Sequence, residues 1–170
     1  MIIRKVLLAI TAFATAAALA LGVGTTATAA PSSAQQASGS QAAAGYYGWY
    51  YLFNNKTERC VDDSFAYQLR GFGCNFQSFQ TFFVEQGADG YYYLGNQATG
   101  RCIDDSAEYG LRGFACHYGD YQDWRIYNTN HGVALQNRAT GRCIDDSAEY
   151  GLRAVPCYNN IYQAFVFDRP

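Results

Sequence analysis

The feature that most constrains the fold of this chain is a threefold internal repeat. Residues 99–112 and 140–153 both read TGRCIDDSAEYGLR, and residues 57–70 carry a diverged copy, TERCVDDSFAYQLR. A first cysteine, a second cysteine and a downstream glutamine recur in each copy at spacings of 42 and 41 residues. The sequence therefore predicts three tandem repeats, at about 46–87, 88–129 and 130–170, with no insertion larger than one residue.

Each repeat has the pattern of β structure. Four short aromatic or aliphatic runs occur per repeat, separated by Gly, Asn and Asp; the first runs are Tyr50–Leu52, Tyr91–Leu94 and Gly132–Leu135. Short runs between turn-forming residues are typical of strands. Beyond the N-terminal segment, no stretch shows a helical period. The sequence predicts an all-β domain with four strands in each repeat.

Three four-stranded repeats are compatible with a solenoid, a propeller or a closed trefoil. A solenoid needs atypical capping repeats at its ends, whereas the third repeat is almost a copy of the second. A propeller usually has at least four blades. We therefore expect a β-trefoil of twelve strands around a pseudo-threefold axis, in which closure removes exposed sheet edges.

The N-terminal segment has the features of a secretory signal. Arg4 and Lys5 precede an uncharged, Ala-rich stretch, and Ala27-Thr28-Ala29 forms a small-x-small cleavage site. These features predict a signal peptide over residues 1–29; the alternative is an uncleaved anchor, since roughly 19 uncharged residues could nearly span a bilayer. Residues 30–44 lack aromatic and charged side chains, which is typical of a flexible low-complexity tether. We expect a secreted, extracellular protein whose folded domain covers residues 45–170.

Composition excludes several classes of protein. The chain has 12 basic and 14 acidic residues, and no basic runs. It therefore lacks the positive surface of a nucleic-acid binder. Aromatic residues make up 16% of the chain, which is too many for a disordered protein. We expect a monomer that binds neither nucleic acid nor, after signal cleavage, a membrane.

The six cysteines indicate a disulfide framework. Six cysteines in a secreted chain allow about 15 pairings, but only one respects the repeat: Cys60–Cys74, Cys102–Cys116 and Cys143–Cys157, each with a separation of 14. A metal site is the alternative. The chain has no Cys-x-x-Cys, and its two histidines, His117 and His131, are not repeated. We therefore expect no metal and no cofactor, and place both histidines at the surface.

These motifs resemble the ricin B-type β-trefoil lectin family. That family combines a Thr-Gly-x-Cys-x-Asp strand, a second Cys and a Gln-x-Trp motif. Gln122-Asp123-Trp124 matches the last motif fully, whereas Gln80-Thr81-Phe82 and Gln163-Ala164-Phe165 have Phe for Trp. The resemblance covers the whole domain and implies core positions for Gln80, Phe82, Gln122, Trp124, Gln163 and Phe165.

Each disulfide loop carries the side chains that a sugar site needs. A carboxylate accepts hydrogen bonds from adjacent hydroxyls, an arginine donates a fork of hydrogen bonds, and an aromatic ring covers the apolar face of a pyranose. The resemblance implies that the Asp two residues after each first Cys binds sugar. The candidate carbohydrate-binding residues are Asp62, Asp104, Asp145, Tyr109, Tyr150, Arg112, Arg153 and Phe114.

The chain departs from the family pattern at two positions of every repeat and at a third position in the last repeat. The binding Gln of the family is replaced by Arg70, Arg112 and Arg153. Its aromatic platform is Phe72, Phe114 and Val155, and its binding Asn is replaced by Phe79, Tyr121 and Tyr162. The same residue types also have structural interpretations. The Asp-Asp-Ser segment could cap its own backbone, the Arg could pair with an Asp across the loop, and the Tyr could pack as a lid.

Three functions compete. The first is a lectin-like protein that binds a glycan or polysaccharide. The second is a non-sugar interaction or inhibitor protein with degenerate sugar sites, which the replaced Gln and Asn favour. The third is an enzyme that uses the paired carboxylates. Adjacent strand residues point to opposite faces, and the Asp pair occurs three times without a unique nucleophile, so we expect no catalytic activity.

Overall fold

The computed structural model describes residues 45–170, so the predicted signal peptide (1–29) and tether (30–44) lie outside the described residues. The described part contains no helix that is long and apolar enough to cross a membrane. Its helices are the short 3-10 turns η1 (Ser78–Gln80), η2 (Ala88–Gly90) and η3 (Ile161–Gln163). Its strands are β1 (Gly48–Asn54), β2 (Arg59–Ser64), β3 (Gln68–Gly73), β4 (Thr81–Gln86), β5 (Tyr92–Asn96), β6 (Arg101–Ser106), β7 (Gly110–Ala115), β8 (Trp124–Thr129), β9 (Gly132–Asn137), β10 (Arg142–Ser147), β11 (Gly151–Pro156) and β12 (Phe165–Asp168).

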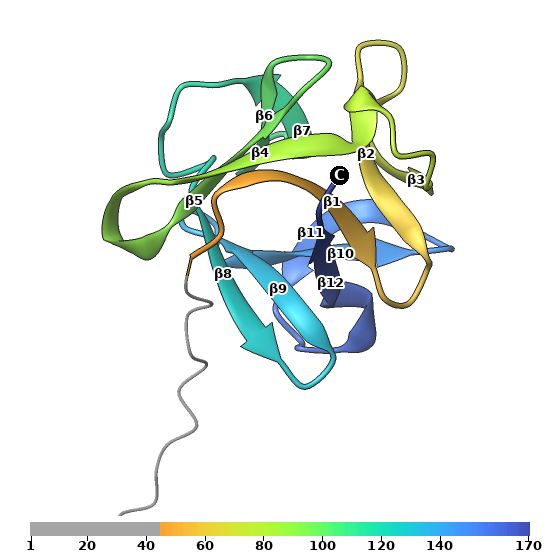
Figure 1. Ribbon diagram of the computed structural model, residues 1–170. Helices are drawn as coiled ribbons and strands as arrows, with labels where there is room; N and C mark the ends of the chain where they lie inside the picture. Colours follow the sequence, from red (N-terminus) through yellow and green to blue (C-terminus); the bar gives the residue numbers. More distant parts are fainter. Residues whose placement is uncertain (1–44) are drawn as a thin grey trace, which may run out of the picture. The chain divides into compact units, whose positions relative to one another are not determined.

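Six of the strands close into an antiparallel barrel (Figure 1). β1 pairs with β4 and β12, β5 pairs with β4 and β8, and β9 pairs with β8 and β12. The remaining strands form one hairpin per repeat: β2–β3, β6–β7 and β10–β11. Two barrel strands and one hairpin, repeated three times, make a β-trefoil. The predicted fold class is therefore confirmed.

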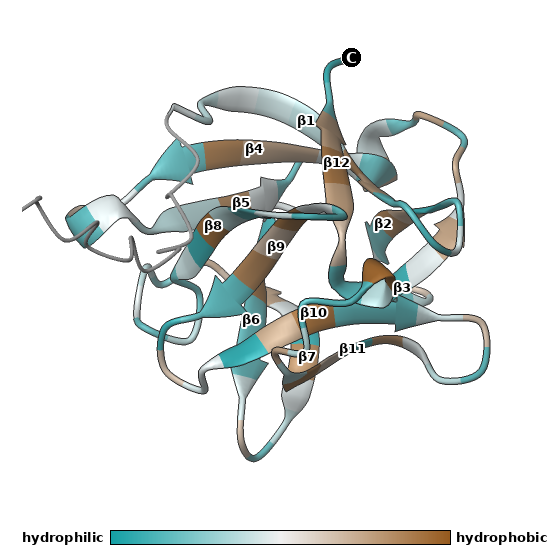
Figure 2. Ribbon diagram, turned by 90° about the horizontal axis from the view of Figure 1, so that it is seen from below, coloured by the Kyte–Doolittle hydropathy of each residue, from teal (hydrophilic) through white to brown (hydrophobic). Residues whose placement is uncertain are grey.

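The core is filled by the same positions of each repeat. Figure 2 shows hydrophobic stretches along β4, β9 and β12, whereas many of the connecting loops are hydrophilic. Phe82, Trp124 and Phe165 are fully buried in one cluster, and Trp124 Nε1 donates a hydrogen bond to the Ile103 carbonyl at 2.9 Å. Three equivalent leucines pack against the edge of this cluster and are only partly buried: Leu69, Leu111 and Leu152.

The three disulfides form within the repeats, as predicted. They join Cys60 to Cys74, Cys102 to Cys116 and Cys143 to Cys157. The buried glutamine of each Gln-x-Trp motif fastens the backbone after the second cysteine. In the second repeat, Gln122 Oε1 accepts hydrogen bonds from the backbone of His117 and Tyr118, and Gln122 Nε2 donates to the Ala115 carbonyl. Gln80 and Gln163 make the equivalent bonds.

Ion pairs connect the repeats in a closed ring. Each joins an arginine near the first cysteine of one repeat to the second aspartate of another: Arg101 to Asp63, Arg142 to Asp105 and Arg59 to Asp146. Every arginine donates to its carboxylate through both Nε and Nη2, and the Nε distances are 3.0–3.1 Å. A threonine hydroxyl of the same repeat as the arginine also donates to each carboxylate: Thr57, Thr99 and Thr140. The aspartates are buried, so each pair replaces lost hydration with directed hydrogen bonds.

Two glycines permit this close approach. A Cβ atom added to Gly113 would lie 2.5 Å from an oxygen of Asp63, and one added to Gly71 would lie 2.5 Å from an oxygen of Asp146. Real Cβ atoms do not approach oxygen so closely. A side chain at Gly71 or Gly113 would therefore require the neighbouring aspartate to shift. In the third repeat Ala154 occupies the equivalent position, and the Arg142–Asp105 pair still forms.

Replacement of Arg101 tests the ring. Its side chain is 14% exposed and that of Asp63 only 1%. Arg101→Met should lower the free energy of unfolding by about 3–5 kcal/mol, because it leaves a buried carboxylate without its cation. Chemical denaturation followed by fluorescence measures the change. Arg125→Met is the matched control, since Arg125 is exposed and should change stability by less than about 0.5 kcal/mol; equal effects of the two variants would contradict a role for the ring.

Candidate functional site

The predicted binding residues lie on the three hairpins, where each aspartate pairs with the arginine opposite it. Arg112 Nε donates to Asp104 Oδ1 at 2.9 Å, and the register places the two residues directly across the β6–β7 ladder. Arg70 with Asp62 (3.0 Å) and Arg153 with Asp145 (3.1 Å) repeat this contact. The carboxylates are buried, whereas the arginine side chains are 29–39% exposed. The arginine thus forms the outer surface of each site and the aspartate its floor.

The Asp-Asp-Ser segments are strand and not turn. Only the serine caps the hairpin: Ser106 Oγ accepts a hydrogen bond from the Tyr109 backbone N–H at 3.0 Å. Ser64 and Ser147 do the same for Tyr67 and Tyr150. The first aspartate of each segment belongs to the site, and the second belongs to the ion-pair ring.

Aromatic rings cover the site arginines. The Arg112 guanidinium carbon lies 4.4 Å from the ring centre of Tyr109 and 4.2 Å from that of Phe114. In the first repeat, Arg70 has the same relation to Tyr67 and Phe72. In the third repeat, Arg153 stacks on Tyr150 alone, because Val155 replaces the second ring. The rings hold the guanidinium in place while much of their own surface stays exposed.

Hydrogen-bonding capacity remains in each site. Within residues 45–170, the terminal nitrogens of Arg70, Arg112 and Arg153 make no hydrogen bond to protein. In the same region, Asp123 Oδ1 is the one buried side-chain polar atom without a partner. The Oδ2 atoms of Asp62 and Asp145 also have no hydrogen-bond partner in this region, but they are not among the buried atoms, so they contact solvent. Each of these two sites offers donors and an acceptor side by side.

The site of the third repeat is a pocket of about 280 Å³. Asp145, Tyr150 and Arg153 line it together with Tyr158 and Tyr162. Hydrogen bonding with the Glu149 carboxylate, and to a lesser degree burial, raises the pKa of the Tyr150 hydroxyl. The structure thus brings three of the residues singled out in the sequence into one cavity.

The second repeat adds a residue that the sequence placed merely at the surface. His117 Nε2 lies 3.4 Å from Asp104 Oδ2, and its ring packs edge-on against Phe114 with centroids 6.1 Å apart. His117 is thus a member of the second site. Its position directly after the second cysteine was the available signal, but Asn75 and Tyr158 occupy that position in the other repeats, so the repeat pattern hid it.

The first repeat departs at the hairpin turn. Gln68 has φ of 59°, where Gly110 and Gly151 have 69° and 70°. Glycine adopts this left-handed conformation without steric cost, whereas glutamine adopts it only at a cost in free energy. Gln68 also contacts the second repeat, since its Oε1 accepts a hydrogen bond from Arg101 Nη1 at 3.0 Å. The first hairpin is therefore partly committed to the contact between repeats.

Metal-ligand geometry is not found in the described part of the chain. No group of three or more His, Cys, Asp or Glu side chains is arranged there to hold an ion.

Comparison with known proteins supports the fold. The family model described as ricin-type β-trefoil lectin domain-like matches residues 75–151. No curated protein matches the chain significantly. Among solved structures, the designed threefold-symmetric protein ThreeFoil shares 18% identity with a TM-score of 0.65, and the match covers 72% of this chain and 99% of that one.

Natural proteins share the same architecture. The ricin B-like lectin of Macrolepiota procera, solved with lactose, has 13% identity and a TM-score of 0.64, covering 74% of this chain and 98% of the lectin. An exo-β-1,3-galactanase from Clostridium thermocellum has 19% identity and a TM-score of 0.65, covering 72% of this chain but only 30% of the enzyme. At these identities the likeness establishes the fold alone.

Replacing a site arginine by the residue of the family pattern tests the arginine–aspartate pair. Arg112→Gln removes the cation above Asp104, whose side chain is 1% exposed. We expect a loss of about 1–3 kcal/mol in the free energy of unfolding, less than for a fully buried pair because Arg112 reaches solvent. Chemical denaturation measures it, with Arg125→Gln as the control. An unchanged midpoint would mean that Asp104 is held by other contacts.

Proposed function

We propose that this chain, a β-trefoil whose residues 75–151 match a ricin-type β-trefoil lectin-like family model, is a secreted carbohydrate-binding protein. The binding groups are the aspartate, arginine and tyrosine of each hairpin. One observation carries the proposal: in the third repeat, Asp145, Tyr150 and Arg153 line a single open pocket of about 280 Å³. Pockets of this kind combine an apolar ring with a few placed polar groups, as small polar ligands require.

The chemistry of the pocket suits a sugar. The free oxygen of Asp145 can accept a hydrogen bond from a hydroxyl, and the terminal nitrogens of Arg153 can donate to a neighbouring hydroxyl oxygen. The Tyr150 ring is 60% exposed and can cover the C–H face of a pyranose. Arginine in place of the family glutamine supplies more donors but no acceptor, so we expect a sugar specificity that differs from galactose.

The second and third repeats should bind best. They share fourteen identical residues around the site and have glycine at the hairpin turn. The first repeat has Gln68 there, and Gln68 is bonded to Arg101. A single shallow site of this kind has a dissociation constant on the order of 1 mM, or about 4 kcal/mol. A polymer that reaches two sites would bind more tightly through effective concentration.

Secretion belongs to the same proposal. Three disulfides persist in oxidising compartments and are rare in the cytosol. Together with the predicted signal peptide, they support an extracellular location. The alternative, a trefoil that binds another protein through the same hairpins, rests on the engagement of each site aspartate by arginine.

Removal of the tyrosine rings tests the proposal. Tyr109 and Tyr150 are exposed, so Tyr109→Ala and Tyr150→Ala should leave the fold intact. Each variant should weaken binding to an immobilised polysaccharide about fivefold, the worth of one stacked ring, and the double variant should nearly abolish it. A glycan screen with the whole protein identifies the polysaccharide, and surface plasmon resonance measures the change.

The control is Tyr47→Ala, because Tyr47 is equally exposed but lies outside the three hairpins. Binding that survives the double variant at full strength would locate the sugar elsewhere. If the glycan screen shows no binding while a purified secreted protein is captured through Tyr109 and Tyr150, the non-sugar alternative holds.

A further inference from the structure

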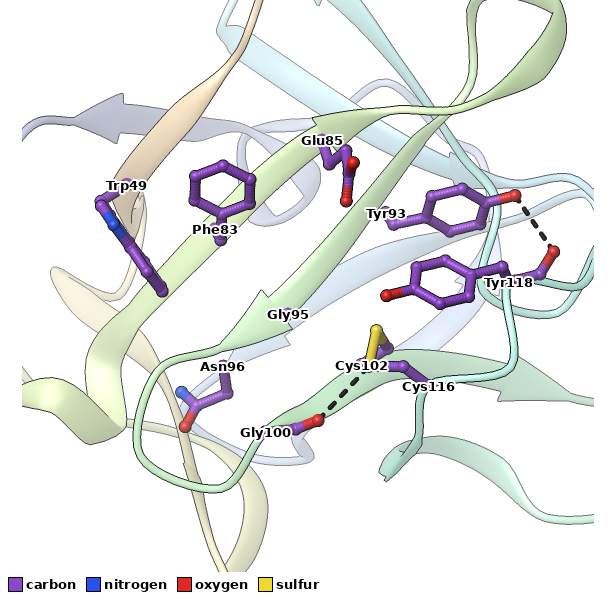
Figure 3. Close-up of a pocket in the computed structure, with 10 residues that line it drawn as sticks. All are labelled: Trp49, Phe83, Glu85, Tyr93, Gly95, Asn96, Gly100, Cys102, Cys116 and Tyr118. Carbon is purple, nitrogen blue, oxygen red and sulfur yellow. Dashed lines mark hydrogen bonds between the residues drawn. A yellow bond between two sulfur atoms is a disulfide. The ribbon is translucent and has the colours of Figure 1, made fainter.

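A second kind of cavity lies outside the hairpin sites. It is a groove of about 370 Å³ between β1, β4, β5 and the loop after the second disulfide. Figure 3 shows Trp49 and Phe83 on one side of this groove, Tyr93 and Tyr118 on the other, and the Glu85 carboxylate directed into the space between them. We call it the Glu85 groove. Its rings are fixed in edge-to-face pairs: the centroids of Trp49 and Phe83 are 5.0 Å apart, and those of Tyr93 and Tyr118 are 4.9 Å apart.

The carboxylate in this groove has no partner. Within residues 45–170, the exposed Glu85 side chain makes no ion pair and no hydrogen bond to protein. Each of the six hairpin aspartates, by contrast, is paired with an arginine. The polar groups around it are engaged. Asn96 is bonded to the backbone through both its oxygen and its nitrogen, and the Tyr93 hydroxyl donates to the Tyr118 carbonyl at 3.1 Å. Glu85 therefore supplies a negative charge to a mostly apolar, aromatic space.

The same arrangement recurs in the first repeat. A groove of about 320 Å³ is lined by Tyr51, Phe53, Phe76, Val166 and Asp168. Tyr51 and Phe76 take the places of Tyr93 and Tyr118: their ring centroids are 5.1 Å apart, and the Tyr51 hydroxyl donates to the Phe76 carbonyl. Asp168 takes the place of Glu85. We call this cavity the Asp168 groove.

The third repeat has lost the rings and the carboxylate together. Tyr127 stands where Glu85 and Asp168 stand, and its ring is buried against Ala134, which replaces Tyr93 and Tyr51. The Tyr127 hydroxyl donates to Asn159 Oδ1 at 3.1 Å. A tyrosine of the chain itself thus fills the equivalent space. The aromatic rings and the carboxylate are present together in two repeats and absent together in the third. We infer that they contact the same ligand.

Backbone conformation gives independent support. Tyr118, Phe76 and Asn159 occupy equivalent positions with φ of 56°, 59° and 51°. Asparagine tolerates this left-handed region, whereas a bulky aromatic residue there is strained by about 1–2 kcal/mol. The two open grooves keep an aromatic ring despite this strain, and the filled position has the favourable asparagine. Strain retained in this way points to a functional constraint on the ring.

These features select a class of ligand. Within residues 45–170, the groove side chains that make no hydrogen bond are the Glu85 carboxylate, the Tyr118 hydroxyl and the Trp49 indole N–H, whereas aromatic rings supply most of the lining. An unmethylated ammonium is strongly hydrated through its N–H groups, and it gives up part of that hydration on contact with ring faces. A quaternary ammonium has no N–H group, and it is attracted to the faces of aromatic rings and to a carboxylate. We propose that the Glu85 groove binds a quaternary ammonium cation of the choline type.

Tryptophan fluorescence reports on this site directly. Trp49 is 40% exposed and lines the groove, whereas Trp124 is fully buried in the core. Choline chloride should change the emission saturably in the millimolar range, relative to sodium chloride at equal ionic strength. Dimethylbutanol, the uncharged carbon isostere of choline, should bind at least about fivefold more weakly. No saturable response to choline, or equal binding of the two compounds, would overturn the proposal.

Two variants locate the cation. Glu85→Gln should weaken choline binding about fivefold. Glu108→Gln, an equal change of charge at an exposed hairpin position, should leave choline binding unchanged. Tyr118→Asn installs the residue of the third repeat and removes a ring while relieving the backbone, so it should lose choline binding without loss of stability. Glycan binding through the hairpins should persist in these variants, which separates this proposal from the function proposed above. Choline binding that is unchanged in Glu85→Gln and Tyr118→Asn would refute it.

Discussion

Three buried arginine–aspartate pairs join the repeats of this trefoil into a closed ring. A single repeat has two barrel strands and one hairpin, too little to bury a core by itself. Each pair ties the start of one hairpin to the middle of another, and the third contact closes the ring. Because the carboxylates are buried, the pairs tolerate little displacement. Small residues stand at the equivalent position of all three hairpins: Gly71, Gly113 and Ala154. The relative positions of the hairpins follow from this geometry.

The same ring organises the candidate binding sites. Along a strand, successive side chains point to opposite faces, so the two members of each Asp-Asp pair face different partners. Asp105 faces an arginine of the next repeat, and Asp104 faces Arg112 of its own hairpin. In every hairpin, the aspartate of the candidate binding site is therefore next to the aspartate of the ion-pair ring. Movement of a hairpin would therefore disturb its binding site and its ion pair to the neighbouring repeat together, so the ion pair also restrains the site.

The three repeats are alike in the core and different at the surface. The buried Gln80, Gln122 and Gln163 make the same three kinds of hydrogen bond in every repeat. Surface cavities show no such uniformity, because a groove that is open in two repeats is filled by Tyr127 in the third. Packing permits only small variation inside the barrel, whereas exposed positions can diverge with little effect on stability. Ligand specificity can therefore change one repeat at a time.

Whatever the repeat carries three times could be predicted from the sequence. The strands, the trefoil and the disulfide pairing were predicted correctly, because symmetry turns one short motif into three equivalent structures. The three aspartates and three arginines of the candidate sites were named on the same basis. The sequence did not reveal that Arg101 pairs with Asp63, 38 residues away, or that His117 joins the second site. It also gave no sign of the groove that Trp49 and Tyr118 share. The Arg101–Asp63 pair joins different repeats, which only closure of the barrel brings together. His117 and Trp49 are not repeated, so no pattern in the sequence marks them.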